Sequence, residues 1–383
     1  MRRRAAHLLT ILATLAMTGC SSVDKINPFA AAPTDKPAEL GAVQGGGAAR
    51  VLWNNSVGDG GEFVFTPAVV GERVFAAGRN GRIYRFDNGK QVWRADAGKD
   101  ISGGVGADAK VVVVGTSKGE VLAFDADSGK PLWQALVSSE VLAAPAVADG
   151  LAVVRSGDSR IFGFDAASGT RRWVYQRSTP ALSLRSNVGV TLLDRALIAG
   201  FPGGKLVAIA TNNGAAIWES TVALPKGATE LERVADVASS PVAAGREVCA
   251  AAYQGRVTCF DLASGNALWS RDLSSRAGID VDGRHVYVSD DKGIVHALDR
   301  NSGSSIWKQD KLANRRLSRP VALGSLVAVA DFEGMVHFLR ADDGHIVTRQ
   351  KTDGGEVLAE PQRSGSGLVV QTRKGGIYAL GAN

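Results

Sequence analysis

Residues 121–133, VLAFDADSGKPLW, contain the pattern that decides the fold. Related strings recur along the chain as GRIYRFDNGKQVW (81–93), SRIFGFDAASGTRRW (159–173), GKLVAIATNNGAAIW (204–218), GRVTCFDLASGNALW (255–269) and GIVHALDRNSGSSIW (293–307). Two weaker copies follow as GMVHFLRADDGHIVT (334–348) and GGIYALG (375–381). The period of 38 to 51 residues between successive tryptophans, in a chain rich in β-forming residues, predicts a β-propeller.

Each copy of the string has a local structural logic. The apolar stretch VLAF suits a strand, and Asp125 with the Ser128-Gly129 pair suits a turn into the next strand. That strand ends at Trp133, whose large apolar face can fill the space between neighbouring sheets. Two further strands precede each string, as in residues 141–156, so each unit predicts a four-stranded antiparallel blade. Because Asp125 and Trp133 recur in blade after blade, we interpret them as turn and packing residues.

The two ends of the chain predict the number of blades. The last copy, GGIYALG, supplies a third strand without a fourth, whereas ARVLWNNSV (49–57) is a fourth strand that nothing precedes. These pieces complete each other, which predicts an all-β, eight-bladed propeller over residues 49–383 with about 42 residues per blade. Pairing of the N- and C-terminal strands in one blade would leave no open sheet edge at the seam.

The first residues have the features of an export signal. Arg2, Arg3 and Arg4 precede a short apolar run, and Met17-Thr18-Gly19-Cys20 resembles the lipobox of bacterial lipoproteins, with Met17 where that motif usually has Leu. The resemblance implies a signal peptide over 1–19, lipidation of Cys20 and, because Ser21 follows instead of Asp, anchoring to the outer membrane on its periplasmic side. Residues 20–48, rich in Ala, Gly and Pro, predict a flexible tether.

Charge and hydropathy argue against nucleic-acid binding and against a membrane-spanning helix after the signal. The formal net charge is +6, and removal of the three signal arginines lowers it to about +3. Since no basic run or basic-aromatic patch stands out, nucleic-acid binding is not expected. No later stretch approaches 18 consecutive apolar residues, so no spanning helix is expected.

Two longer intervals interrupt the regular repeat. Successive tryptophans are 40 residues apart three times, and the spacing then becomes 45 and 51. The extra residues predict long inter-blade loops at about 175–187 and 220–238. Because strands alternate in direction, connections between blades emerge on one face, so both loops should lie on the same rim. Extra loop length on a rigid scaffold is where binding function tends to be placed.

The repeated motif A-[FL]-D-x-x-[ST]-G-x-x-x-W resembles the tryptophan motif of quinoprotein-type propellers. Together with the lipoprotein signal, it makes the chain similar to the family of the outer-membrane protein assembly factor BamB. The most specific segments are TPALSLRS (179–186) and ATELERVADVASSPV (228–242). The resemblance implies a non-enzymatic lipoprotein scaffold of the β-barrel assembly machinery that binds BamA and assists the folding and insertion of outer-membrane β-barrel proteins. Whether unfolded outer-membrane proteins are bound as well is left open.

The same resemblance implies a partner-binding site on the rim. Four residues match the family's BamA-contacting positions: Leu182, Leu184, Arg185 and Asp236. Two leucines two positions apart in an extended loop would point the same way, and an arginine is a frequent interface hot spot. One departure is Ala238, where the family has a second carboxylate. The alternative is that the leucines lie under their own loop and Arg185 pairs with Asp236 to brace it.

A second class of function is a periplasmic propeller that binds a quinone or another small ligand as a redox enzyme or sensor. Quinoprotein dehydrogenases of this motif class have longer chains, calcium ligands, a base Asp and adjacent cysteines, and the last of these are not found here. The G-x-S-x-G match at 115–119 lies in a predicted hairpin with no helix after it. His296 and His337 occupy equivalent repeat positions without metal-ligand spacing. We therefore expect no enzyme activity, no cofactor, no metal and a monomer.

Cys249 and Cys259 lie on the two arms of a predicted hairpin, REVCAAAYQGRVTCFD. A turn near Gln254-Gly255 places them opposite each other, and an exported protein meets an oxidising compartment, which favours a cross-strand disulfide. A register that differs by one residue would instead point two buried thiols to opposite faces of the sheet. The sequence does not decide between these alternatives.

Overall fold

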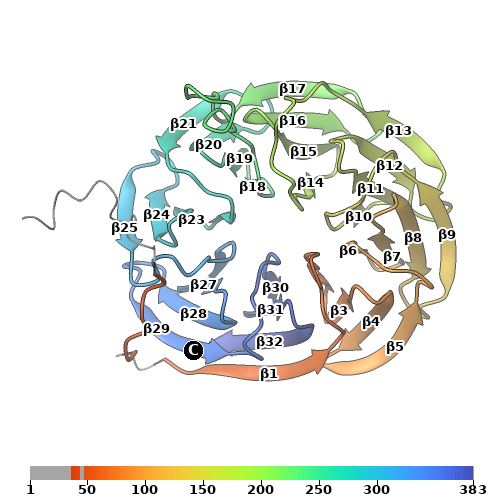
Figure 1. Cartoon of the computed structure of the whole chain (residues 1–383), viewed down its shortest axis with the longest axis horizontal. Coiled ribbons are helices and arrows are strands. Elements are labelled where there is room, and N and C mark those ends of the chain that lie inside the picture. Colours follow the sequence, from red (N-terminus) through yellow and green to blue (C-terminus); the bar gives the residue numbers. More distant parts are fainter. Residues whose placement is uncertain (1–35, 44–46, 383) are drawn as a thin grey trace, which may run out of the picture. The chain divides into compact units, whose positions relative to one another are not determined.

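The computed structural model describes residues 36–43 and 47–382. Thirty-two strands form eight four-stranded antiparallel sheets, which follow one another around a ring (Figure 1). No helix occurs in these ranges, so the prediction of an all-β, eight-bladed propeller is confirmed. The described part of the chain accordingly contains no helix with the length and hydropathy needed to cross a membrane.

Blades are numbered from the first complete sheet, and each is given from its innermost to its outermost strand. Blade 1 consists of β2 (Ala68–Val70), β3 (Arg73–Ala77), β4 (Arg82–Asp87) and β5 (Lys90–Asp96), and blade 2 of β6 (Gly103–Ala107), β7 (Val111–Gly115), β8 (Glu120–Asp125) and β9 (Pro131–Leu136). Blade 3 consists of β10 (Ala146–Ala148), β11 (Leu151–Arg155), β12 (Ile161–Asp165) and β13 (Arg171–Tyr175), and blade 4 of β14 (Val190–Leu192), β15 (Ala196–Phe201), β16 (Lys205–Ala210) and β17 (Ala216–Thr221). Blade 5 consists of β18 (Val242–Ala244), β19 (Glu247–Ala251), β20 (Arg256–Asp261) and β21 (Ala267–Asp272), and blade 6 of β22 (Gly278–Val281), β23 (His285–Ser289), β24 (Val295–Asp299) and β25 (Ser305–Gln309). Blade 7 consists of β26 (Val321–Leu323), β27 (Leu326–Ala330), β28 (Met335–Arg340) and β29 (Ile346–Lys351), and blade 8 of β30 (Gln362–Ser364), β31 (Gly367–Gln371), β32 (Gly376–Ala382) and β1 (Ala49–Ser56).

The ring closes through blade 8, as the sequence predicts. Strand β1 is the outermost strand of this blade and pairs antiparallel with β32, from Ala49 opposite Ala382 to Ser56 opposite Gly376. The two ends of the propeller therefore meet in one sheet (Figure 1). No turn joins these strands, so the seam is held by non-covalent contacts, of which the β1–β32 pairing is the most extensive.

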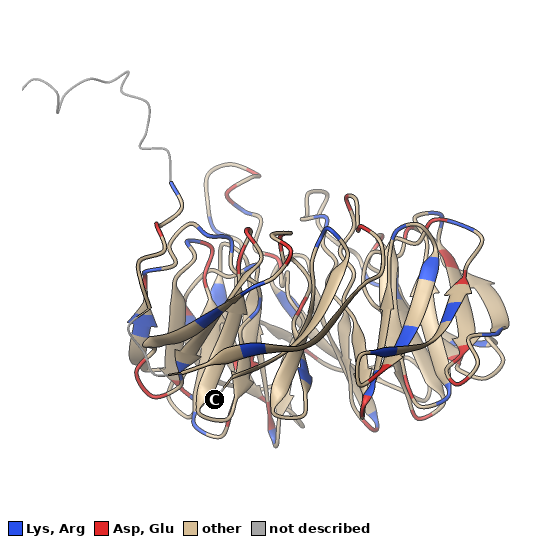
Figure 2. Cartoon of the chain, turned by 90° about the horizontal axis from the view of Figure 1, so that it is seen from below, with Lys and Arg blue, Asp and Glu red and all other residues tan. Residues whose placement is uncertain are grey.

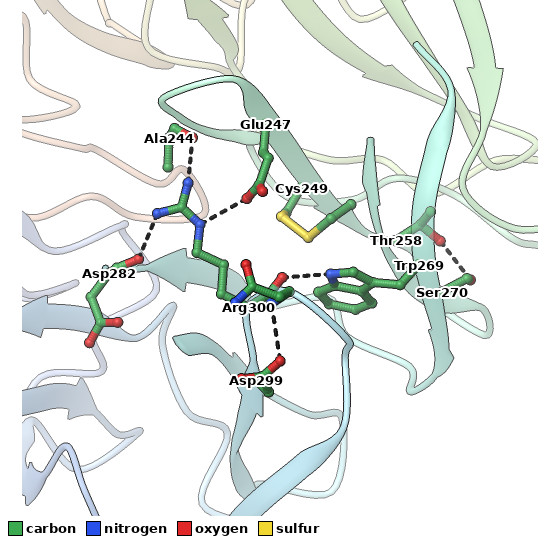
Figure 3. The surroundings of a disulfide bond; sticks show 11 residues. Ala244, Glu247, Cys249, Thr258, Trp269, Ser270, Asp282, Asp299 and Arg300 are labelled. Carbon is green, nitrogen blue, oxygen red and sulfur yellow. Dashed lines mark hydrogen bonds and ion pairs between the residues drawn. A yellow bond between two sulfur atoms is a disulfide. The ribbon is translucent and has the colours of Figure 1, made fainter. Parts of the chain in front are cut away.

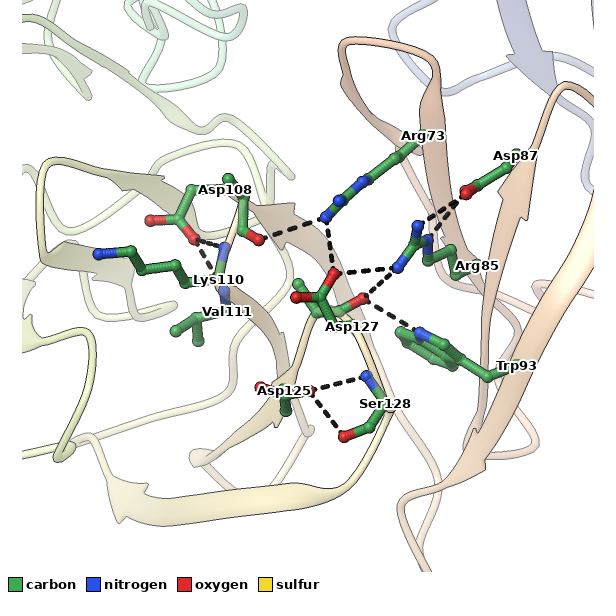
Figure 4. Close-up of polar contacts among 12 residues, drawn as sticks. Arg73, Arg85, Asp87, Trp93, Asp108, Lys110, Val111, Asp125, Asp127 and Ser128 are labelled. Carbon is green, nitrogen blue, oxygen red and sulfur yellow. Dashed lines mark hydrogen bonds and ion pairs between the residues drawn. The ribbon is translucent and has the colours of Figure 1, made fainter.

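The repeated string forms the contact between neighbouring blades. Trp93 of blade 1 lies against the hairpin of blade 2, where a Cβ on Gly129 would be 2.8 Å from its ring and where φ is +70°. The indole nitrogen of Trp93 donates to the carbonyl of Ala126 at 3.1 Å, and Asp125 braces the same turn by accepting from Ser128 (Figure 4). The equivalent indole donation occurs in six blades, at 2.7 to 3.1 Å. These residues are therefore architectural.

The eighth tryptophan position, occupied by Thr348, is explained by the seam. A tryptophan in one blade packs against the glycine in the last hairpin of the next blade, and blade 8 has no such hairpin because β32 and β1 are chain ends. At this place the Thr348 hydroxyl accepts a hydrogen bond from the Ala49 backbone nitrogen at 3.2 Å. The small polar residue thus tethers the start of the closing strand.

Part of the segment predicted as a tether lies on the propeller. The compact unit that contains the ring begins at Pro37. The Ala38 nitrogen donates to the Ala313 carbonyl at 2.9 Å, while Arg315 and Arg349 donate to the carbonyls of Ala38 and Gly41 at 3.0 and 2.7 Å. The signal peptide, Cys20 and the first part of the tether lie outside the described residues.

Candidate functional site: the rim of blades 3 to 5

The two longest inter-blade connections of the described chain lie where the sequence predicts them. Residues 176–189 join β13 to β14, and residues 222–241 join β17 to β18. Seen edge-on in Figure 2, loops and hairpins project from the two rims while the strands form the wall between them. Both long loops share a rim with the hairpins between second and third strands, because Asp236 bonds to Leu184, Gly203 and Tyr253. We call these two loops the long-loop rim.

Asp236 joins three segments of this rim. Its side chain is buried, and its carboxylate accepts hydrogen bonds from the backbone nitrogens of Leu184 at 2.7 Å and Gly203 at 2.9 Å. Its own carbonyl accepts from the Tyr253 nitrogen at 2.8 Å, in the hairpin between β19 and β20. Each oxygen of the carboxylate thus has a backbone donor. Asp236 is thus buried and holds the 176–189 loop to blades 4 and 5, while its contact with a partner stays a prediction.

Arg185 pairs with a different carboxylate from the one considered in the sequence analysis. Its Nε and Nη2 atoms donate to the two oxygens of Glu140 at 3.1 and 2.7 Å, which is a bidentate ion pair between the 176–189 loop and the preceding connection. This hydrogen-bonded pair lowers the pKa of Glu140. The alternative in which Arg185 pairs with Asp236 is therefore wrong. Both residues hold the 176–189 loop, but Arg185 does so through Glu140 and Asp236 through the Leu184 backbone. The Arg185 side chain remains 58% exposed.

The two predicted leucines differ in their surroundings. Leu182 is 43% exposed, whereas Leu184 is half-buried in the wall of a groove. Leu182 therefore does not lie under its own loop. The other long loop adds two exposed aliphatic side chains that the sequence analysis did not single out, Leu224 at 65% and Leu231 at 72%. Leucines in a polar inter-blade loop, where no strand pattern requires them, were the signal that could have identified them.

The groove beside Leu184 separates the 176–189 loop from the hairpin between β11 and β12. Its walls include Leu184, Arg155 and several serines. The Arg155 Nη1 atom donates to the Gly200 carbonyl at 2.7 Å, and its guanidinium lies 5.1 Å from the centre of the Phe201 ring. Burial lowers the pKa of Arg155 to about 10, an effect that the nearby charge of Asp236 opposes.

Cys249 and Cys259 are direct partners on β19 and β20. The Ala252 nitrogen donates to the Arg256 carbonyl, so alternation along the ladder makes Cys249 and Cys259 a non-hydrogen-bonded pair, the kind whose Cα atoms approach most closely. Their Cα atoms are 4.0 Å apart, and Figure 3 shows the sulfurs joined beside Trp269. The alternative register, with the two side chains on opposite faces, does not occur.

The two histidines and the 115–119 segment that the sequence analysis considered for catalysis or metal binding all lie in hairpins, where they make local hydrogen bonds. His296 and His337 each contact an aspartate of their own hairpin, Asp290 and Asp331, both at 2.9 Å. The described ranges contain no cluster of three or more His, Cys, Asp or Glu side chains that could hold a metal ion. The 115–119 segment turns between β7 and β8, where the Thr116 hydroxyl accepts from the backbone of the same hairpin.

Comparisons with known proteins agree on one family. Residues 79–309 match a family described as Outer membrane protein assembly factor BamB. The chain is 43% identical over 328 residues to the protein of that name from Bordetella pertussis, a match that covers 85% of this chain and 83% of the relative. The crystal structure of BamB from Moraxella catarrhalis has a TM-score of 0.81 and 28% identity, covering 87% of this chain and 100% of that one.

One further likeness concerns the fold alone. The quinohemoprotein alcohol dehydrogenase from Comamonas testosteroni has a TM-score of 0.68 at 14% identity, and the match covers 87% of this chain and 76% of the enzyme. Propellers of one shape serve unrelated functions, so at this identity the likeness carries no functional inference. The Bordetella relative is named as an outer membrane protein assembly factor and the Moraxella protein as BamB, whereas the Comamonas protein is named as an alcohol dehydrogenase.

Proposed function

The chain belongs to the family of the outer membrane protein assembly factor BamB, and on that premise we propose that it is a non-enzymatic scaffold of the β-barrel assembly machinery. In this role it binds the periplasmic part of BamA and assists the folding and insertion of outer-membrane β-barrel proteins. The lipid on Cys20 would hold it to the outer membrane, facing the periplasm. A single chain with a closed ring fits a scaffold that is monomeric on its own.

The observation that carries this proposal is the long-loop rim. Buried Asp236 and the ion pair of Arg185 with Glu140 join the 176–189 loop to neighbouring segments of the ring, while Leu182 stays exposed. Preorganised loops reduce the ordering entropy that binding must overcome, and exposed aliphatic side chains supply the apolar centre of an interface. The rim therefore has the composition of a protein-binding surface.

The alternative function, a quinone- or ligand-binding propeller, finds less support in the residues of the innermost strands. Asp280 of β22 pairs with Arg363 of β30 and accepts from the Ala322 nitrogen at 2.8 Å. Arg319 pairs with Glu360 at 2.6 Å. Arg319 also lies 3.9 Å from Asp280, so these charged groups form one ion-pair network across blades 6 to 8 in which their charges are paired with one another. A visible absorbance spectrum and an intact mass spectrum of the purified chain test the alternative, since it requires a bound cofactor.

The test of the favoured function uses Leu184→Ala and Arg185→Ala in the mature chain. Truncation of a hot-spot side chain typically costs about 2 kcal/mol of binding free energy, so each variant should bind purified BamA periplasmic domains about thirtyfold more weakly. The control is Leu132→Ala, because Leu132 is a leucine on the outer strand β9 that does not belong to the long-loop rim. Folded variants that both bind as tightly as the wild type would exclude this rim as the interface.

A further inference from the structure

We propose that the groove between the β11–β12 hairpin and the 176–189 loop receives a carboxylate side chain of the partner, with Arg155 as its anion-binding group. The inference rests on the proposed function, because it concerns the same rim. It adds a chemical requirement: the partner segment that docks beside Leu184 carries an acidic residue. Three observations support the proposal: Arg155 has no carboxylate partner among the described residues, a second arginine lies beside Phe201, and serine hydroxyl groups line the walls.

Arg155 differs from the other sequestered arginines of the ring. Arg85 pairs with Asp87 at 2.6 Å (Figure 4), and Arg300 pairs with Glu247 at 2.8 Å (Figure 3). Arg155 is half-buried at the end of β11, yet no carboxylate of the described residues lies within 4.0 Å of its guanidinium nitrogens. A guanidinium has five N–H donors, and the one hydrogen bond to protein seen here is that to Gly200. An unpaired, partly desolvated cation is unfavourable in the free protein and is stabilised by an incoming anion.

A second arginine increases the positive character of this region. The guanidinium of Arg177 lies 5.2 Å from the centre of the Phe201 ring that Arg155 also contacts. Arg177 pairs with Glu219 at 3.3 Å, but its Nη1 atom is buried without a hydrogen-bond partner among the described residues. The acidic group that acts on Arg155 is Asp236, whose two oxygens already accept from backbone amides. Neither arginine is therefore fully compensated by the propeller itself.

The groove walls also contain serine hydroxyl groups, which are neutral donors, and the apolar side chain of Leu184. Ser159, Ser183 and Ser186 line it, and in the described chain their hydroxyls make no hydrogen bond to other protein groups. The lining contains one acidic residue, Glu140, whose carboxylate is paired with Arg185. Free hydroxyls around a guanidinium suit a carboxylate, which accepts several hydrogen bonds at once. Leu184 in the wall and exposed Leu182 beyond it would contact apolar residues next to that acid.

The experiment measures binding of purified BamA periplasmic domains to the full mature chain by calorimetry at low and high salt. Arg155→Gln removes the charge and should weaken binding about tenfold or more at low salt, with a smaller salt dependence than the wild type has. Arg155→Lys keeps the positive charge but lacks the planar guanidinium, so its affinity should lie between those of the wild type and Arg155→Gln. The matched control is Arg160→Gln, which removes one positive charge from the same hairpin, where Arg160 pairs with Asp158 at 3.0 Å.

The outcomes separate this proposal from the function on which it rests. Wild-type affinity and salt dependence for Arg155→Gln, while Leu184→Ala and Arg185→Ala lose affinity, would overturn the groove assignment and leave the rim as the interface. Wild-type affinity for all three would overturn both. If Arg155→Gln unfolds, Ser183→Trp takes its place, because Ser183 is exposed and a tryptophan there fills the groove from the surface. Its loss of binding supports the proposal, and wild-type binding refutes it.

Discussion

Replacement of Asp236 by alanine tests whether this residue acts through the loop or through the partner. The substitution leaves the backbone nitrogens of Leu184 and Gly203 without their acceptor, at a position that is 4% exposed. Each unsatisfied buried donor costs about 1 to 3 kcal/mol, so the two donors together cost about 2 to 6 kcal/mol. Water at the rim recovers part of this, and we therefore expect a loss of about 2 to 4 kcal/mol. Asp236→Asn keeps one acceptor oxygen but presents an amide group to the other donor, and should cost roughly half as much.

The loss should be concentrated in the 176–189 loop. Urea unfolding of the mature chain measures the change in stability, and amide hydrogen exchange measures protection at Leu184 and Gly203. We expect faster exchange at both amides in Asp236→Ala, together with weaker BamA binding because the loop must be ordered on association. The control is Asp194→Ala, since Asp194 lies in an exposed turn of the same blade and its side chain is 89% exposed.

One result would refute this reasoning. If Asp236→Ala retained wild-type stability and wild-type protection at Leu184 but lost partner binding, the carboxylate would have to contact the partner directly. Unchanged stability with unchanged binding would show instead that the two backbone hydrogen bonds contribute little to the loop.

Three further predictions concern the seam, the anchor and the cysteines. A chain that starts at Gly58 lacks β1 and exposes the edge of β32, so it should melt at a lower temperature or aggregate, as differential scanning fluorimetry and light scattering would show; a monomer with unchanged melting contradicts the role of the seam. Cys20→Ala should abolish fatty-acid labelling and release the protein into the periplasmic fraction, whereas retention in the membrane in high salt without BamA argues against lipidation. Thiol counting under denaturing, non-reducing conditions should find Cys249 and Cys259 unreactive, and two free thiols would show that the disulfide does not form in the protein.

The fold could be predicted in detail because its determinants are local and repeated. Each copy of the string contains a strand, a turn braced by residues such as Asp125, and a tryptophan that docks on the next blade, so one period specifies both a blade and its junction. The pairing of β1 with β32 followed from the incomplete copies at the two ends. The reason for Thr348 did not follow, since it depends on the absence of a hairpin in blade 8 that becomes visible only when the ring is closed.

The site could be located from sequence but not built. Tryptophan spacing identified both long loops, and the family resemblance named four residues on them. The contacts of those residues could not be predicted from the sequence. Glu140, which pairs with Arg185, lies 45 positions earlier, and the repeat does not determine the loop conformation that brings them together. For Cys249 and Cys259 the difficulty was the register, because a shift of one residue reverses the face on which a side chain lies.

The position of the candidate site follows from how the ring is held together. Blade junctions depend on the tryptophan, the glycine of the next hairpin and the carbonyl that the indole nitrogen contacts, all of which lie in outer strands or in the hairpins that precede them. Inter-blade loops are not part of this junction, so they can lengthen without disturbing it. The ends of the 222–241 loop pack into the core between blades 4 and 5 through residues such as Val222 and Val237. The 176–189 loop is held in addition by Asp236 and by the pair of Arg185 with Glu140. Loss of these restraints should therefore impair recognition while leaving the propeller folded.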